Sequence, residues 1–248
     1  MMLDFNKGST KTTTAAGDLT ARINAHIDQA LQEEDAKKPA RQYLGASLIG
    51  EPCLRKIQYS YQQVESQPRD GKSLRIFAAG HVFEDMTARE LKLAGFDLRT
   101  HKADGSQFGF FVAGGQIRGH IDGVLCGGPV AMLYPALWEH KALGQKSWNE
   151  VVKKGVTAAK PVYAAQIAMY QAYMDLTEAP ALFTARNRDT QQLYHEVVPF
   201  DSALAQRMSD KAVLILEATE ASELLPRIAG NPSYFQCRWC AFAERCWK

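Results

Sequence analysis

The sequence predicts an α/β fold with a mixed sheet flanked by helices, and the order of its hydrophobic patterns is the main reason. Three segments in the first part of the chain have apolar residues at helical spacing (18–31, 47–61 and 73–94). Three short apolar segments, bounded by Gly or Pro and typical of strands, come next (108–112, 116–125 and 136–142). Because helical patterns return after these strands, strands and helices are expected to share one core.

The last third of the chain has clear start signals. Pro161 is suited to the first turn of a helix, where its missing N–H does no harm. Asp201 is a favourable N-cap for a later helix. We therefore expect a helix, a two-stranded hairpin and a long final helix (161–176, 181–186 with 193–198, and 201–225).

Composition limits the classes of function. With 248 residues, 46% of them hydrophobic, and a net charge of +2, the chain is a typical globular protein without a strong field of its own. The first 18 residues lack a signal-peptide core and no run of eighteen apolar residues occurs, so we expect a cytoplasmic protein that does not bind membranes. Five cysteines in a reducing compartment favour metal ligation over disulfides.

One segment resembles the end of a phosphate-binding loop. Gly71, Lys72 and Ser73 lead into a predicted helix, but such a loop needs another glycine five residues before Gly71. Ser66 stands there, and no strand precedes it. We therefore expect no nucleotide cofactor.

The chain divides into four parts by composition. Residues 1–17 are polar and rich in Thr and Lys, and we expect a disordered tail. Residues 18–72 form a helical segment with the first of several cysteines, 73–225 contain the core, and 226–248 form a cysteine-rich end.

Charged side chains lie on two neighbouring predicted core strands. Side chains alternate along a strand, so Asp122 faces away from the apolar Ile121. In the next strand Glu139 and Lys141 share a face about 7 Å apart, with His140 on the opposite face. Such charges cost free energy unless they are paired or bound to metal, which indicates a site.

Two carboxylates and a lysine suit metal-dependent phosphodiester hydrolysis. Carboxylates bind a hard cation, which activates water and neutralises charge on the phosphate. The lysine can orient the attacking water or stabilise the transition state. A solvated strand with a Glu–Lys pair is the alternative interpretation of these residues taken alone.

Two helices add polar residues that share a helix face: His81 with Glu84, and Gln166 with Tyr170. In this order the residues resemble the RecB-like branch of the PD-(D/E)XK nucleases, from about Leu48 to the end of the chain. His81 matches the first motif of the family, and Asp122 matches its acidic second motif. Glu139-His140-Lys141 matches the acidic-x-Lys motif, and Gln166 with Tyr170 matches the Gln-x-x-x-Tyr motif. Ile121 stands where the superfamily has proline, a tolerated departure.

The resemblance implies a restriction-endonuclease-like core and a role for each residue. Mg²⁺ or Mn²⁺ would be held by four groups (His81, Asp122, Glu139 and the main-chain carbonyl of His140). Lys141 would position or activate water, while Gln166 and Tyr170 would hold DNA or support the site. Five basic side chains are candidates for binding backbone phosphates (Lys153, Lys154, Lys160, Arg186 and Arg188).

The implied activity is exonucleolytic cleavage of single-stranded DNA or DNA ends in prokaryotic or phage recombination. A CRISPR spacer-acquisition nuclease is the alternative, and a non-catalytic iron–sulfur assembly subunit that binds DNA is an alternative of another class. The resemblance also allows a homo-oligomer or a recombination or adaptation protein as a partner.

Three cysteines lie within ten residues near the end of the chain, and a tetrathiolate site needs a fourth. In iron–sulfur members of the RecB-like family, including the AddB nuclease and CRISPR-associated exonucleases, one early cysteine completes a [4Fe–4S] site. Cys53 matches that position, with Cys237, Cys240 and Cys246 as the other ligands, and Cys126 is left over. Structural Zn²⁺ and four buried structural cysteines are the alternatives.

Overall fold

A computed structural model describes residues 16–248, so most of the expected disordered tail, residues 1–15, lies outside the described part. Contacts divide the chain into two compact units, the residues up to Pro39 with Pro68–Ile76, and Ala40–Gln67 with Phe77–Lys248. None of the helices within the described range is long and apolar enough to cross a membrane.

The first unit contains α1 (Ala16–Ala36) and the first turns of α3 (Gly71–Leu93). Helix α1 begins two residues before the predicted boundary at Asp18 and is longer than expected. Arg69 forms an ion pair with Asp35 at 3.1 Å, and Arg75 forms one with Asp28. These contacts join the loop after Pro68 to the same unit as α1.

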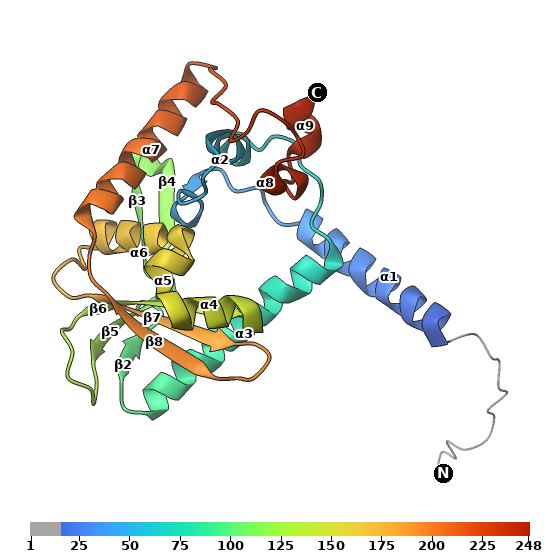
Figure 1. Ribbon diagram of the computed structural model, residues 1–248. Coiled ribbons are helices and arrows are strands. Elements are labelled where there is room, and N and C mark those ends of the chain that lie inside the picture. The colour runs from blue at the N-terminus through green and yellow to red at the C-terminus, as the bar shows by residue number, and fades with distance from the viewer. Residues whose placement is uncertain (1–15) are drawn as a thin grey trace, which may run out of the picture. The chain divides into compact units, whose positions relative to one another are not determined.

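The second unit contains two mixed sheets, which confirms the predicted α/β class (Figure 1). The larger sheet has the order β2-β5-β6-β7-β8, in which only β6 and β7 are parallel (Asp97–Arg99, Gly123–Gly127, Ala136–Leu143, Ala181–Asn187 and Leu193–Val198). The smaller sheet has the order β1-β4-β3 (Leu44–Gly45, Ile117–His120 and Gly109–Val112). The predicted single strand over 116–125 is therefore two strands in different sheets, which separate at Ile121 and Asp122.

Helices cover both faces of the larger sheet. Trp138 packs in one apolar cluster with Ala88 and Leu91 of α3. Phe183 belongs to a second, larger cluster with residues of four further helices, α4 (Gln145–Lys154), α5 (Val156–Ala159), α6 (Pro161–Tyr173) and α7 (Ser202–Glu220). The predicted caps are confirmed, because Pro161 lies in the first turn of α6 and the Asp201 side chain accepts a hydrogen bond from the Leu204 N–H.

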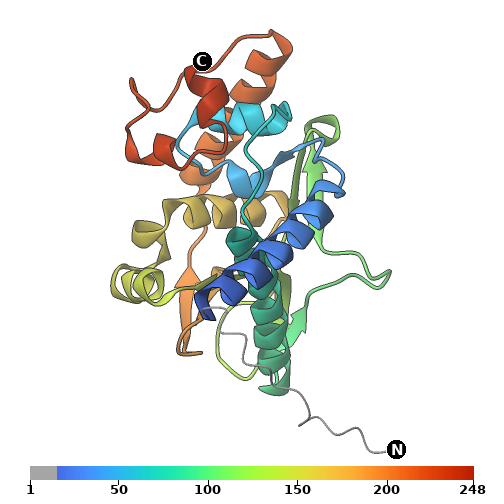
Figure 2. The same ribbon diagram turned by 90° about the vertical axis from the view of Figure 1, so that its right-hand side faces the viewer.

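The early helix α2 (Leu54–Tyr61) and the C-terminal helices α8 (Phe235–Arg238) and α9 (Ala243–Trp247) lie side by side (Figures 1 and 2). The side chain of Gln58 donates to the Glu223 carbonyl at 2.7 Å and accepts from the Leu225 N–H at 2.9 Å. The rings of Tyr59 and Phe242 meet edge to face, with centroids 5.7 Å apart. The helix predicted over 47–61 thus begins only at Leu54, after a 3-10 turn at Ala46–Leu48.

Candidate active site

The predicted acidic residues meet where β5 and β6 pair. Asp122 precedes β5, and its carboxylate accepts a hydrogen bond of 2.7 Å from the main-chain N–H of His140. On β6, Lys141 donates to Oε1 of Glu139, as expected for residues that share a strand face. Glu139 is completely buried, and its second oxygen, Oε2, has no hydrogen-bond partner in the described part of the chain.

Burial raises the pKa of both carboxyl groups. Burial, and then the charge of Asp122, raise the pKa of Glu139 to about 8. Burial also raises the pKa of Asp122 above its ordinary value. Burial opposes the charge on Lys141, yet Glu139 and Asp122 raise its pKa above the ordinary value. The site therefore combines a cationic lysine with carboxyl groups whose ionised forms a bound cation would stabilise.

Glu84 of α3, which shares a helix face with His81, lies near the same carboxyl groups. Burial and the charge of Asp122 raise the pKa of its carboxyl group to about 7, so it belongs to the same group of acids. His81, which we expected to ligate metal, has a side chain that is 84% exposed, with Nδ1 at 3.9 Å from a Glu84 oxygen. Helical spacing placed both on one face, but the packing of α3 turns Glu84 inward and leaves His81 at the solvent edge.

Gln166 and Tyr170 of α6 line a cavity of about 180 Å³ beside the carboxyl groups. Burial and the charge of Glu139 raise the pKa of Tyr170 above its ordinary value, so its hydroxyl remains protonated. A Cβ atom at Gly119 would lie only 2.8 Å from the Tyr170 ring, so close approach of β4 to α6 requires glycine there.

Two arginines form the other wall of this cavity. The guanidinium groups of Arg41 and Arg118 lie 5.1 and 5.0 Å from the centre of the Tyr43 ring. Neither arginine has a carboxylate within ion-pair distance among residues 16–248. His120 and Ser47 complete a polar lining. This basic cavity could not be predicted from the sequence, because Arg41 and Arg118 lie about 75 positions apart and no motif joins them.

A buried network lies on the other face of β6. The hydroxyl of Thr87 donates to the Phe83 carbonyl at 2.8 Å and accepts from Arg186 Nε at 3.0 Å. It also lies 3.1 Å from Nε2 of His140. Because the single hydroxyl proton is already used, the imidazole must donate. Burial, with the charges of Lys141 and Arg186, lowers the pKa of His140 to about 3 and keeps the ring neutral.

This network fixes the main chain at His140, whose N–H donates to Asp122. Arg186 is only 3% exposed and pairs with Glu90 of α3, so its guanidinium group is used within the protein and we propose no phosphate contact for it. Because the ring of His140 is fixed to α3, its main-chain N–H is fixed toward Asp122.

The other predicted basic residues lie around α4 and the β7–β8 turn. Lys154 and Lys160 both contact Glu150, at 3.3 and 3.0 Å. Lys153 is exposed in the last turn of α4. Arg188, in the turn after β7, is partly exposed and lies next to Gly144 at the start of α4. These four remain candidates for phosphate binding on an edge of the second unit.

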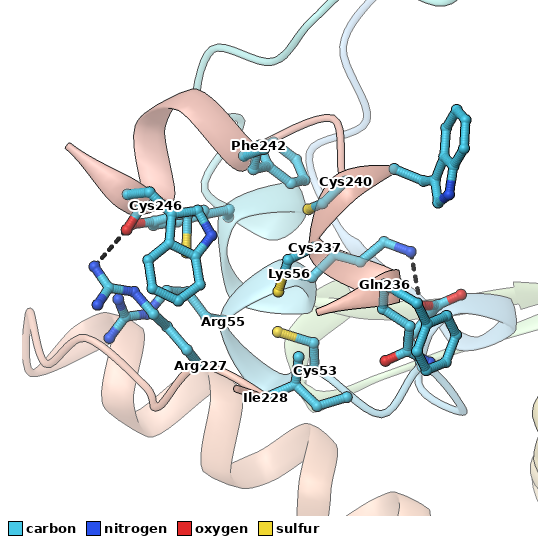
Figure 3. A pocket seen from close by; sticks show the side chains of 16 residues that line it. Cys53, Arg55, Lys56, Arg227, Ile228, Gln236, Cys237, Cys240, Phe242 and Cys246 are labelled. Atoms are coloured by element: carbon cyan, nitrogen blue, oxygen red, sulfur yellow. Dashed lines mark hydrogen bonds and ion pairs between the residues drawn. The ribbon is translucent and has the colours of Figure 1, made fainter. Parts of the chain in front are cut away.

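The four predicted cluster cysteines line one cavity of about 330 Å³ between α2 and the C-terminal helices. Figure 3 shows their thiol groups directed into it, those of Cys53 and Cys237 toward one another. Burial, and then the other three cysteines, raise the pKa of the Cys237 thiol. Cys126 lies on β5 and does not line this cavity.

Oxygen and sulfur donors gather at two places in the second unit. As they stand, residues 16–248 contain no group of three or more His, Cys, Asp and Glu side chains that could hold a metal ion. The unpartnered Oε2 of Glu139, with Asp122 and Glu84 nearby, offers the oxygen ligands that Mg²⁺ and Mn²⁺ prefer. Four thiols around one cavity suit iron–sulfur or zinc ligation.

Comparisons with known proteins bear on the fold alone. No family model and no curated protein matches the chain. Among solved structures, the alkaline exonuclease LHK-Exo from Laribacter hongkongensis matches with 16% identity and a TM-score of 0.52, over 78% of this chain and 93% of that one. Its complex with dAMP matches with 15% identity and a TM-score of 0.51, over 80% and 93%. The chain therefore has a mixed α/β fold similar to that of this alkaline exonuclease, which agrees with the expected nuclease-type fold.

Proposed function

We propose that this protein is a Mg²⁺- or Mn²⁺-dependent deoxyribonuclease that acts as an exonuclease on single strands or DNA ends. The observation that carries the proposal is the buried, unpartnered oxygen of Glu139 beside Asp122 and Lys141. A buried carboxylate oxygen without a hydrogen-bond partner costs free energy, which a bound cation would recover. The similar fold of an alkaline exonuclease supports the same reaction class.

Each residue of the site has a proposed task. Asp122, Glu139, Glu84 and the His140 carbonyl would hold the cation, with His81 in reach from the solvent side. A bound cation supplies Lewis acidity and lowers the pKa of a ligated water. Lys141 would orient that water and stabilise negative charge on the phosphate, since its raised pKa keeps it cationic. Gln166 and the neutral Tyr170 would donate hydrogen bonds to the DNA strand in the adjoining cavity.

Arg41 and Arg118 would bind backbone phosphates beside the acids. Both are exposed, and their planar guanidinium groups suit bidentate phosphate contacts. The alkaline exonuclease of similar fold was crystallised with dAMP, a nucleoside monophosphate. Lys153, Lys154, Lys160 and Arg188 would extend the phosphate contacts along the protein. DNA-end processing in prokaryotic or phage recombination is the pathway that we propose, and CRISPR spacer acquisition is the alternative.

We further propose that the cysteine cavity holds a [4Fe–4S] cluster. All four thiols reach one cavity although Cys53 is 184 residues from Cys237, so the cluster would fasten the C-terminal segment to α2. Zn²⁺ is the alternative because it accepts the same tetrathiolate ligands.

Digestion of labelled DNA tests the proposed activity. Linear single- and double-stranded DNA, each labelled at one 5′ or 3′ end, is compared with closed circular DNA in Mg²⁺, Mn²⁺ or EDTA. We expect mononucleotides or short fragments from linear DNA, little from circles, and none in EDTA. Cleavage that continues unchanged in excess EDTA would rule out the proposed chemistry.

The raised pKa values predict a metal effect on stability that grows with pH. A free glutamate titrates near 4.5, whereas in the fold the pKa of Glu84 is raised to about 7 and that of Glu139 to about 8. The folded state thus holds these protons more tightly, and without metal its stability falls as the pH rises from about 4.5 to about 8. Metal that binds the ionised forms offsets this loss.

We expect one fixed Mg²⁺ concentration, a hundred times the Kd at pH 8, to raise Tm by about 5–10 °C at pH 8 and by little at pH 5, where protonated carboxyl groups bind the cation weakly. Thermal unfolding is followed at both pH values with Mg²⁺ or EDTA, and Glu139→Gln should remove most of the pH dependence. An equal Tm shift at the two pH values would contradict the assignment of these acids as ligands.

A further inference from the structure

The C-terminal segment exposes aromatic side chains on its outer surface. Trp239 is 88% exposed, the most exposed of the large hydrophobic side chains in the described residues, and Phe235 is 56% exposed. The rings of Tyr234 and Phe235 lie 4.8 Å apart, centre to centre. Trp239 and Phe235 also line the rim of the cysteine cavity. An exposed tryptophan of this kind is typical of a binding surface.

Positive charge is concentrated on the same segment. Residues 226–248 contain four basic residues and one acidic residue, a net charge of +3, whereas the whole chain has +2 and the remaining residues therefore −1. Arg238 and Arg245 are exposed, and neither is within ion-pair distance of a carboxylate that the structure describes. The aromatic surface is thus accompanied by cations that are free to meet an anion.

We propose that this surface, defined by Tyr234, Phe235, Arg238 and Trp239, holds a single strand of DNA on its way to the active site. The inference rests on the proposed nuclease function. Bases stack on exposed aromatic rings, and arginines bind the phosphates between them. A duplex offers phosphates but keeps its bases stacked inside, so the aromatic rings favour single strands.

The cysteine cavity and the arginine cavity approach each other along one short segment of the chain. Glu51 lines the cysteine cavity together with Trp239, and Ser47 lines the arginine cavity beside Tyr170. Glu51 is four positions after Ser47, which limits their Cα atoms to at most about 14 Å apart. A strand of DNA held at the aromatic surface could therefore continue toward the cavity beside Tyr170.

Trp247, in the same C-terminal segment, has a structural role that Trp239 lacks. It is only partly exposed, and the Arg227 guanidinium group lies 4.4 Å from its ring centre. Arg227 also donates to the Cys246 carbonyl, so this pair closes the cavity from one side. Trp239 has no comparable ring contact among the residues described, so closing the cavity does not account for it.

The test compares Trp239→Ala, Trp239→Phe and Arg238→Ala with a control variant, Leu93→Ala. The control removes an apolar side chain that is 71% exposed and lies outside the C-terminal segment. Binding of fluorescein-labelled single- and double-stranded 20-mers is measured by anisotropy in EDTA, which prevents cleavage, over a range of salt concentrations. Iron content, kcat and KM on single strands are measured on the same full-length preparations.

We expect Trp239→Ala to weaken single-strand binding about tenfold, with little change for duplex, and Trp239→Phe to restore most of it. Arg238→Ala should reduce the slope of the logarithm of the binding constant against the logarithm of the salt concentration by about the amount that one phosphate contact contributes. KM should rise in both alanine variants, while kcat and iron content stay at the values of Leu93→Ala.

Three results would overturn the inference. Unchanged single-strand binding in both alanine variants, with normal cleavage, would reject the surface and leave the nuclease proposal standing. Loss of iron in Trp239→Ala together with weaker DNA binding would show that the tryptophan protects the cluster and does not bind DNA itself. A change in oligomeric state by light scattering, without a change in DNA binding, would assign the surface to a protein partner. Wild-type protein that neither binds nor cuts DNA would instead reject the proposed function itself.

Discussion

Glu139→Gln is expected to reduce DNA cleavage by about a thousandfold or more while the protein stays folded. Glutamine cannot become an anion, so the cation and its water lose their central ligand, and a loss of several kcal/mol from the transition state corresponds to that factor. Without metal the glutamate is itself protonated at neutral pH, since its pKa is raised to about 8, and glutamine has the same shape. The amide oxygen can still accept from Lys141.

Initial rates on labelled single strands, with Tm as the control for folding, measure this effect. Asp122→Asn and Lys141→Met should be affected as severely, whereas Glu150→Gln, a carboxylate that contacts only Lys154 and Lys160, should cleave normally. Glu84→Gln is expected to lose more activity than His81→Ala, because Glu84 is the residue that faces the other acids. A Glu139→Gln enzyme that cleaves at close to the wild-type rate would show that the active site lies elsewhere.

Cys53→Ser is expected to lose the metal of the cysteine cavity as completely as Cys240→Ser. Protein purified anaerobically should be brown and hold about four irons per chain, and both variants should be colourless. Removing the metal should also lower Tm, because its binding energy would otherwise fasten the C-terminal segment to α2. Iron, sulfide and zinc analysis with visible absorbance measures the outcome.

Cys126→Ser is the matched control, since this cysteine does not line the cavity and should leave the metal in place. A colourless wild-type protein with one zinc per chain would replace the cluster by a structural zinc site. If Cys126→Ser loses the metal and Cys53→Ser keeps it, the fourth ligand has been chosen wrongly.

Local rules were sufficient for part of the fold and part of the site. Strand alternation predicted that Glu139 and Lys141 share one face of β6, and the structure confirms it, because Lys141 Nζ donates to Oε1 of Glu139. The N-cap role of Asp201 is likewise confirmed. Both depend on residues within three positions of each other, so periodicity and capping chemistry determine them before any tertiary contact forms.

Helix α4 shows where local rules fail. Its first residue, Gln145, follows a glycine that has no side chain to cap the helix, so the segment carries no start signal. The cap comes from Asp189, whose carboxylate accepts the Gln145 N–H at 2.8 Å from the β7–β8 turn. The N–H of Val156 in α5 is satisfied in the same way by Glu196. Only the pairing of β6 with β7 and of β7 with β8 brings these acceptors close.

What the sequence determined by itself is the set of chemical groups and their local geometry: two carboxylates and a lysine on strands, and four cysteines in two distant segments. Tertiary structure decided which neighbours complete each set. The packing of α3 on the sheet brought Glu84 to the other acids and buried Arg186 against Glu90. The physical reason is that charge and spacing are properties of a segment, whereas burial depends on the segment packed against it.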